Sequence, residues 1–306
     1  MAETWFVELA TRGLLALTGE DRQAFLQGLV TNDIDKVAAG RAIYAALLTP
    51  QGKYLHDFFI AAAGDTLWLE GEAARLPDLE RRLAAYRLRA RVTIARPAGD
   101  FAIFAACGAT AAAALGLAAE PGRAAPMAGG FAFVDPRLAD LGVRLVAPRP
   151  GALARLAEAG FGAAEFAAYD RMRIEYGVPD GSRDLTVDKT VLLEAGFDEL
   201  NGIAWQKGCY VGQELTARTR YRGLVKRRLM PVRIDGVPPE PGTKVTRDGE
   251  DVGEMRSAVA DRGLAVLRID AASRPGAALQ AGAARLVPIK PDWMNLPETA
   301  PEASET

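Results

Sequence analysis

Residues that bind metals or form disulfides are scarce in this sequence. Its 306 residues include one histidine, His56, and two cysteines, Cys107 and Cys209. Two cysteines cannot make a disulfide framework. With one histidine they are also too few for a Cys/His zinc site or a four-cysteine cluster within one chain. We therefore expect both thiols to be free, and any metal cluster to need ligands from another molecule.

Long hydrophobic runs and a strong net charge are also missing. No uncharged apolar run reaches the ~18 residues that a membrane span needs, and residues 1–9 lack the basic and apolar regions of a secretory signal. The formal net charge is -2, which gives no overall attraction to nucleic acid or to anionic membranes. We expect a monomeric, cytoplasmic protein that binds no membrane and for which nucleic acid is a disfavoured partner.

The composition is that of a folded protein, with 49% hydrophobic and 25% charged residues. Apolar segments at 43–48 and 54–60 flank a turn with Pro50 and Gly52, and predict a β-hairpin. The alanine-rich residues 109–119 predict a helix. Helices and strands alternate along this part of the chain, which indicates an α+β fold.

Two later stretches have clear patterns. Residues 163–176 predict a helix that ends at Gly177 and Pro179. Short strands between residues 230 and 269 are separated by Pro, Gly and Asp-Gly turns, and predict a small antiparallel β-barrel or sandwich.

The segment 207–214, Lys-Gly-Cys-Tyr-Val-Gly-Gln-Glu, is the most informative in the chain. Residues 212–223 predict a helix, so Cys209 is expected just before a helix N-terminus, where unpaired N–H groups favour an anion. Lys207 adds positive charge, and both effects would lower the pKa of the thiol. The alternative is that Cys209 is a small buried hydrophobic residue, as free cysteines often are.

A basic run follows this segment. Its six cations have no acidic residue among them, and a solvated helix end is the simplest explanation. Binding of a folate glutamate tail, an acidic partner or RNA are the functional alternatives. The run comprises Arg218, Arg220, Arg222, Lys226, Arg227 and Arg228.

The string Lys-Gly-Cys-Tyr-x-Gly-Gln-Glu resembles the signature of the YgfZ family of folate-binding proteins, relatives of the aminomethyltransferase (T-protein) of the glycine cleavage system. Residues 17–33, 48–57 and 173–177 (Arg-Ile-Glu-Tyr-Gly) are also similar to family segments. The resemblance implies a three-domain ring around a central opening that receives tetrahydrofolate. It also implies a role in assembling or repairing iron–sulfur clusters on client proteins.

The resemblance and the element order together predict five parts of the chain. We expect an N-terminal α+β domain completed by part of a later segment, a ferredoxin-like α+β domain, a segment with the folate-facing helix and the cysteine signature, a C-terminal β-barrel, and a short frayed tail. These parts are residues 1–100, 101–164, 165–227, 228–290 and 291–306.

The resemblance further implies which residues face the folate. Glu175 matches the folate-facing glutamate of the T-protein, and a carboxylate can accept two hydrogen bonds from a pterin. The alternative for Glu175 is a surface ion pair with Arg171. Tyr169 and Arg12 fall where the family places aromatic residues. Arg12 departs from that pattern, and it either stacks on a planar ring or is an ordinary solvated arginine. The remaining expected folate-binding residues are Arg173, Asn32 and Asp57.

These observations favour a tetrahydrofolate-binding factor of iron–sulfur cluster assembly or repair, in which Cys209 is the functional thiol and Lys207 supports it. No reaction can be assigned. A folate-dependent aminomethyltransferase is the alternative, but the T-protein signature lacks the Lys-Gly-Cys-Tyr string, and the aspartate that methylene transfer needs cannot be located. A third reading is a folate-using enzyme of RNA modification, such as tRNA modification, that binds RNA through the basic run.

Overall fold

The computed structural model describes residues 4–38, 40–274 and 279–296. The chain divides into two compact units, Met1–Tyr169 with Leu200–Gln213, and Asp170–Glu199 with Glu214–Thr306. The chain therefore leaves the first unit, returns to it for one short segment, and leaves again. The five parts predicted from the sequence stay a prediction, and most of the predicted frayed tail lies outside the described residues.

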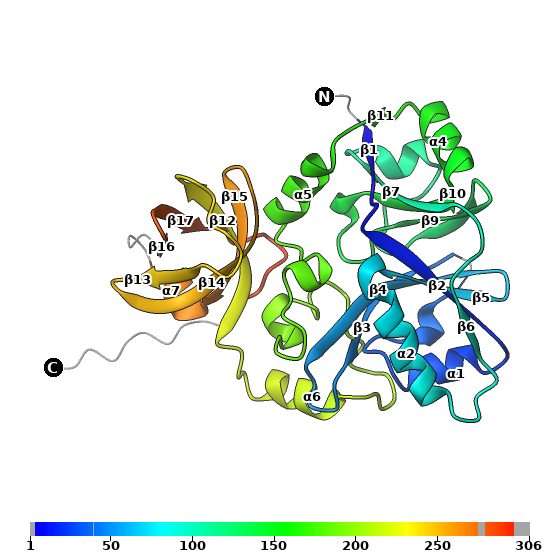
Figure 1. Ribbon diagram of the computed structural model, residues 1–306, viewed down its shortest axis with the longest axis horizontal. Helices are drawn as coiled ribbons and strands as arrows, with labels where there is room; N and C mark the ends of the chain where they lie inside the picture. The colour runs from blue at the N-terminus through cyan, green and yellow to red at the C-terminus, as the bar shows by residue number, and fades with distance from the viewer. Residues whose placement is uncertain (1–3, 39, 275–278, 297–306) are drawn as a thin grey trace. The chain divides into compact units, whose positions relative to one another are not determined.

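The first unit contains two β-sheets (Figure 1). In the five-stranded sheet all neighbours are antiparallel, and the predicted hairpin is confirmed as its β3–β4 edge. The strands, in spatial order, are β3 (Ile43–Leu48), β4 (Tyr54–Ala63), β5 (Thr66–Glu72), β2 (Arg12–Thr18) and β6 (Thr93–Ala95).

In the six-stranded sheet, several strands that are neighbours in space are far apart in the chain. Strand β1 precedes β2 in sequence but pairs with β7 in this second sheet. Its strands, in spatial order, are β11 (Gly162–Ala163), β1 (Trp5–Glu8), β7 (Phe101–Cys107), β10 (Val143–Pro148), β9 (Gly130–Val134) and β8 (Ala124–Met127). The helices α3 (Ala111–Ala114) and α4 (Arg149–Glu158) contribute buried residues to a core with one face of this sheet.

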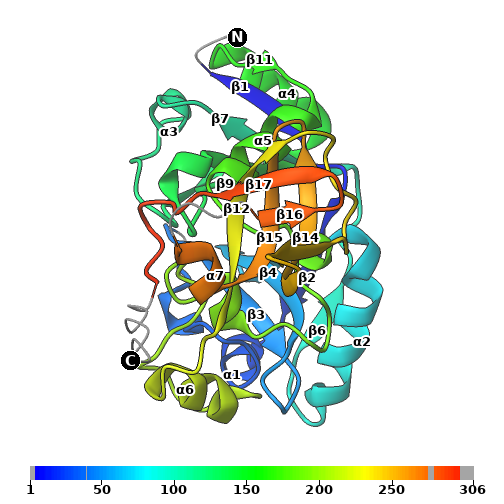
Figure 2. The same ribbon diagram turned by 90° about the vertical axis from the view of Figure 1, so that its left-hand side faces the viewer.

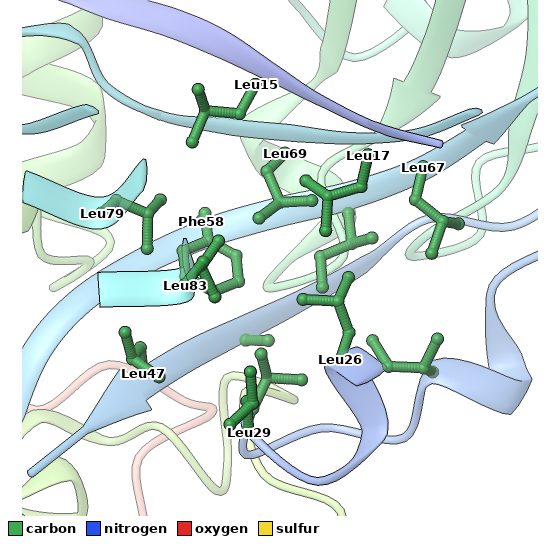
Figure 3. Packing of buried hydrophobic residues seen from close by; sticks show 14 of the residues in the cluster. Leu15, Leu17, Leu26, Leu29, Leu47, Phe58, Leu67, Leu69, Leu79 and Leu83 are labelled. Carbon is green, nitrogen blue, oxygen red and sulfur yellow. The ribbon is translucent and has the colours of Figure 1, made fainter. Parts of the chain in front are cut away.

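One face of the five-stranded sheet packs against α1 (Arg22–Gln27) and α2 (Leu76–Arg87). Alternate side chains of a strand point to the same face, so Leu15 and Leu17 of β2 lie beside Leu67 and Leu69 of β5 (Figure 3). Leu26 of α1 and Leu79 and Leu83 of α2 close over them. We call this set the leucine cluster.

The second unit contains the C-terminal β-barrel (Figure 2). Its closed ring leaves no sheet edge exposed, and Val232, Met255, Leu267 and Leu286 fill the inside. The predicted C-terminal antiparallel barrel is confirmed. Its strands, in spatial order, are β12 (Arg227–Asp235), β15 (Arg262–Arg268), β14 (Glu250–Val259), β13 (Lys244–Arg247), β16 (Leu279–Ala281) and β17 (Ala284–Pro288).

Three helices remain: α5 (Phe166–Glu175), α6 (Gln213–Tyr221) and α7 (Ile269–Ser273). Short 3-10 turns occupy Ile34–Lys36, Ala73–Arg75, Ala139–Leu141, Gly181–Arg183 and Leu192–Ala195. Among the described residues, no helix is long and apolar enough to span a membrane.

Candidate functional site

Residues 207–214, which we call the signature loop, lead into α6. This helix begins at Gln213, so Cys209 lies four residues before it and not directly ahead of it as predicted. The reason is a turn in which the Gln213 amide donates to the Tyr210 carbonyl at 3.2 Å, and the Gln213 side-chain oxygen accepts from the Tyr210 amide at 3.3 Å. Because a helix terminus acts mainly within its first turn, its electrostatic effect on Cys209 is weaker than the sequence predicts.

Lys207 fixes the start of the signature loop. Its ammonium donates to the backbone carbonyls of Gln27 at 2.8 Å, Val30 at 2.6 Å and Asn32 at 2.7 Å. A lysine ammonium has three N–H donors, so all of them are used on the segment that follows α1. Burial lowers the pKa of Lys207 to about 8, while Asp33 opposes the shift. The structure thus gives Lys207 an anchoring role, and its part in thiol chemistry stays a prediction.

The other end of the loop is fixed by Val211 and Gly212. The Val211 amide donates to the Gly28 carbonyl at 3.3 Å, and its side chain packs against the leucine cluster. Gly212 has φ of 83°, and a Cβ there would lie 2.5 Å from the Thr49 carbonyl oxygen. By contrast, a Cβ on Gly208 would meet no atom within 4 Å. Cys209 is therefore exposed on a loop that is held on both sides.

The two thiols have opposite environments. Cys107 is buried in β7, and burial raises its pKa to about 12. A buried thiol of this kind is chemically inert, whereas Cys209 is free and exposed. In the described part of the chain, no group of three or more His, Cys, Asp or Glu side chains could hold a metal ion.

A second polar site, the arginine–aromatic network, lies between the two sheets of the first unit. The guanidinium groups of Arg12, Arg137 and Arg144 all lie over the ring of Phe59, at 5.9, 4.8 and 5.0 Å from its centre. Such contacts are attractive, and more so where water is excluded. Two of the arginines donate to carboxylates: Nε of Arg12 to Glu70 at 2.5 Å, and the Arg137 guanidinium to Asp135 at 2.7 and 3.0 Å. The third, Arg144, donates to the Tyr169 hydroxyl at 2.6 Å.

Asp57 and Asn32 extend this network. Asp57 is buried and accepts hydrogen bonds from the hydroxyls of Tyr44 at 2.9 Å and Tyr54 at 2.7 Å. Burial, reinforced by Asp57, raises the pKa of both tyrosines well above 10. The Asn32 amide donates to the carbonyls of Tyr44 and Asn201, both at 2.7 Å. Since Tyr44 also packs against Phe59, four of the predicted folate residues, Arg12, Tyr169, Asn32 and Asp57, belong to one connected region.

Most polar groups of that region already have protein partners. The Oε2 atom of Glu70 is an exception: it is buried and has no hydrogen-bond partner among the described residues. A buried carboxylate oxygen without a partner marks a place for a water or for a ligand N–H group.

A cleft of about 370 Å³ opens beside the network. Asn32, Tyr44 and Asn201 line it, and Lys36 and Arg41 add two cations. Within the described ranges neither cation has an ion-pair partner. The size is in the ~300–1,000 Å³ range of small-molecule sites. The two cations favour anionic groups on a ligand, although the carboxylate of Glu120 also lines the cleft. Sequence reasoning singled out Asn32 and missed the other lining residues, because they come from separate stretches of the chain that only the fold brings together.

Two predicted folate residues belong to the second unit. Glu175 is exposed, and its carboxylate pairs with Arg171 at 3.0 Å and with Arg262 at 3.5 Å. The surface ion pair weighed as the alternative is therefore present. Arg173 is only 1% exposed and donates to Asp170 and to Ser257, both at 2.7 Å. A direct contact of either residue with folate stays a prediction.

The basic run is not one continuous surface. Arg218 is exposed and pairs with Glu214 at 2.7 Å. Arg228 is buried, donates to the Leu193 carbonyl at 2.9 Å and pairs with Glu199. The prediction of a solvated basic run is wrong at Arg228, because its half-buried carboxylate partner, Glu199, lies 29 residues earlier in the chain.

Comparison with known proteins gives consistent results. Residues 4–141 match the GCVT N-terminal domain family, and residues 226–296 match the C-terminal β-barrel domain of CAF17. The human mitochondrial iron-sulfur cluster assembly factor IBA57 is 35% identical over 282 residues, which cover 84% of this chain and 75% of the relative. The protein of the same name from Mus musculus is 30% identical over 311 residues, which cover 92% and 83%.

Among solved structures, the glycine cleavage system aminomethyltransferase T from Bartonella henselae has a TM-score of 0.76. The match covers 94% of this chain and 84% of that chain, at 16% identity. At this identity the likeness shows the fold alone. The predicted T-protein-like α+β fold is confirmed.

Proposed function

Because the chain belongs to the family of the iron–sulfur cluster assembly factor IBA57, we propose that it supports assembly of iron–sulfur clusters on client proteins, with Cys209 as its functional thiol. The predicted YgfZ label is not confirmed, since these relatives carry the IBA57 name and YgfZ is a related family. The relatives are mitochondrial by name, and a cytoplasmic location for this chain is part of the proposal.

The observation that carries the proposal is the exposed Cys209 on a loop fixed at Lys207 and Gly212. A thiolate is the usual protein ligand of iron–sulfur clusters, and preorganised ligands bind metals more tightly. One thiol cannot hold a cluster alone. We infer that a cluster at Cys209 is shared with a client or carrier protein that supplies the other ligands.

Replacement of each cysteine tests this function. In a strain that lacks the protein, Cys209→Ser should lower the activity of iron–sulfur client enzymes by roughly tenfold or more, because loss of metal-site groups costs at least that much in affinity. Cys107→Ala is the matched control, since it removes the buried thiol and should leave client activity near normal. Full client activity with Cys209→Ser would rule out the thiol role.

The cleft beside Asn32 and Tyr44 supports tetrahydrofolate as the ligand. The amides of Asn32 and Asn201 can pair with a pterin edge, and Lys36 and Arg41 can meet the tail carboxylates. Tetrahydrofolate supplies one-carbon chemistry when bound, but no reaction is proposed. The transferase alternative is less favoured, since Asp57 is buried and engaged by two tyrosine hydroxyls.

Calorimetric titration with tetrahydrofolate tests the cleft. Arg41→Ala should weaken binding about fivefold, as expected for loss of a charge-assisted contact of ~1 kcal/mol. Glu175→Gln serves as the comparison. If Glu175→Gln weakens binding and Arg41→Ala does not, folate binds as the resemblance implied and not in this cleft.

A further inference from the structure

A second groove, which we call the hairpin groove, lies between the β3–β4 hairpin and α2 of the first unit. Its volume is about 250 Å³. Leu48, Pro50 and Leu55 line it from the hairpin, and Tyr86 lines it from α2. Its lining is more apolar than that of the cleft beside the arginine–aromatic network, so it suits hydrophobic side chains rather than a pterin.

The helix α2 presents two different faces. Leu76, Leu79 and Leu83 are buried in the leucine cluster. The residues that line the groove recur three or four positions apart and so form a separate stripe. This stripe is not needed for the core. It consists of Arg81, Arg82, Ala85 and Tyr86.

The groove side of α2 is basic. Residues 75–89 contain five arginines, and their only carboxylates are Asp78 and Glu80. Asp78 is shared by Arg81, Arg82 and the buried His56, and Glu80 pairs with Arg96 at 3.5 Å.

Positive charge therefore remains at the end of the helix. Within the part of the chain that the structure describes, Arg87 and Arg89 have no ion-pair partner. A neighbouring protein with carboxylates would complement this edge, and such complementarity speeds and orients association.

Two large apolar side chains near the groove are exposed. Tyr86 is 43% exposed, and Leu88, two residues later, is 89% exposed. Leu88 also has φ of 41°, a backbone conformation that a leucine rarely adopts. Leu88 is the residue at which α2 ends, but its exposed side chain adds little to the core, and strain of this kind is concentrated at functional sites.

The signature loop packs against the same β3–β4 hairpin. Gly212 lies against the Thr49 carbonyl and against Leu48 and Gly52, and Thr49 and Leu48 also line the hairpin groove. Cys209 is three residues before Gly212. A protein bound in the groove would therefore lie close to the loop that contains the Cys209 thiol.

We propose that the hairpin groove docks the protein that completes the cluster site at Cys209. This partner presents an apolar side chain flanked by carboxylates: the apolar group enters between Pro50 and Tyr86, and the carboxylates meet Arg81, Arg87 and Arg89. The inference rests on the proposed function, since it assigns the partner's chemistry to that site.

Photocrosslinking from the groove tests this proposal. Full-length protein with p-benzoylphenylalanine at position 86 is expressed in cells of the organism that it comes from. A second version carries the probe at Val237, an exposed residue just after β12. We expect position 86 to crosslink to an acidic segment of a protein with iron–sulfur cluster cysteines. The double change Arg87→Glu and Arg89→Glu should reduce that product at least fivefold, and position 237 should not give it.

Crosslinks from position 86 to lipid, to a second copy of this chain or to a basic segment would overturn the proposal, as would equal products from positions 86 and 237. The functional readout uses Leu88→Asp, which replaces an exposed side chain and should not unfold the protein. We expect client-enzyme activity to fall at least fivefold with the melting temperature unchanged. Val237→Asp is the matched control and should have no effect.

The two proposals fail in different ways. If Cys209→Ser lowers client activity and Leu88→Asp does not, the docking proposal fails and the thiol function stands. If Cys209→Ser has no effect, the proposed function fails whatever the groove variants do.

Discussion

Gly212 combines two constraints that no side chain satisfies. Its φ of 83° belongs to the left-handed region, where glycine has no steric penalty. A Cβ would also come within 2.5 Å of a backbone oxygen that cannot move independently of the hairpin. Gly208 has open space around a Cβ, so Gly212 is the glycine of the signature loop that the backbone requires.

We therefore expect Gly212→Ala to destabilise the protein by about 3 kcal/mol, from left-handed strain and from a steric conflict with Thr49. Gly208→Ala, which has open space around it, should change stability by less than about 0.5 kcal/mol. Chemical denaturation measures both. Equal stabilities of the two variants would show that the signature loop is not seated on the hairpin as described.

Among the elements, α5 contacts the barrel within the second unit through several ion pairs and hydrogen bonds, and the buried contact is made by Arg173. The Arg173 guanidinium reaches Ser257 of β14 and also pairs with Asp170 and Asp184. Burial would raise the pKa of Asp170, but Arg183 and Arg173 hold it below its usual value. The buried carboxylates thus depend on this arginine for compensation.

Replacing Arg173 with methionine leaves Asp184 without its arginine partner and Asp170 with Arg183 alone. We expect a loss of about 3–5 kcal/mol, the usual cost of an uncompensated buried charge. Arg171→Met removes two exposed surface pairs of the same helix, with Glu175 and with Asp261, and should cost no more than about 1 kcal/mol. Thermal unfolding of the two variants checks the difference, and a small effect of Arg173→Met would mean that the carboxylates take up protons or water at little cost.

The sequence predicted the elements whose patterns are local. The β3–β4 hairpin follows from Pro50 and Gly52 between apolar strands, and the barrel from regularly spaced turns. The alanine-rich stretch is only partly helical, because α3 covers only Ala111–Ala114 and Gly116, two residues later, has φ of 76°. There the Leu117 amide donates to the Ala112 carbonyl at 2.8 Å and closes the helix.

The partners of the signature loop could not be predicted in the same way. The carbonyls that bind Lys207 are about 180 residues away in sequence, and no local pattern points to them. The same is true of Arg12, whose partner Glu70 lies in a neighbouring strand. Local charge predicts a lysine that activates the thiol, which stays a prediction, whereas the anchoring contacts of Lys207 arise from long-range packing.

At the scale of the whole molecule, the first unit is built from two separate stretches of chain. Residues 200–213 return to it, where the Thr31 hydroxyl donates to the Gly202 carbonyl at 2.6 Å and the Ala204 amide to the Thr31 carbonyl at 3.0 Å. With Lys207 and Val211, these contacts make the short stretch part of the core of that unit.

A chain truncated after Tyr169 should therefore be less stable than the same unit in the full protein, and a synthetic peptide of residues 200–213 should raise its melting temperature by mass action. A peptide with Lys207→Met should do so much less, because three carbonyls stay unpaired. Equal stabilisation by both peptides would contradict the anchoring role of Lys207.

The late position of this anchor also orders events during synthesis. Translation proceeds at roughly 5–20 residues per second, so the first 169 residues leave the ribosome seconds before Lys207 does. Until then the carbonyls of Gln27, Val30 and Asn32 lack the Lys207 ammonium, and the β3–β4 hairpin lacks its contact with Gly212. The segment bearing Cys209 is thus the last piece of the first unit to arrive, and an incomplete nascent chain cannot yet present the thiol in its fixed setting.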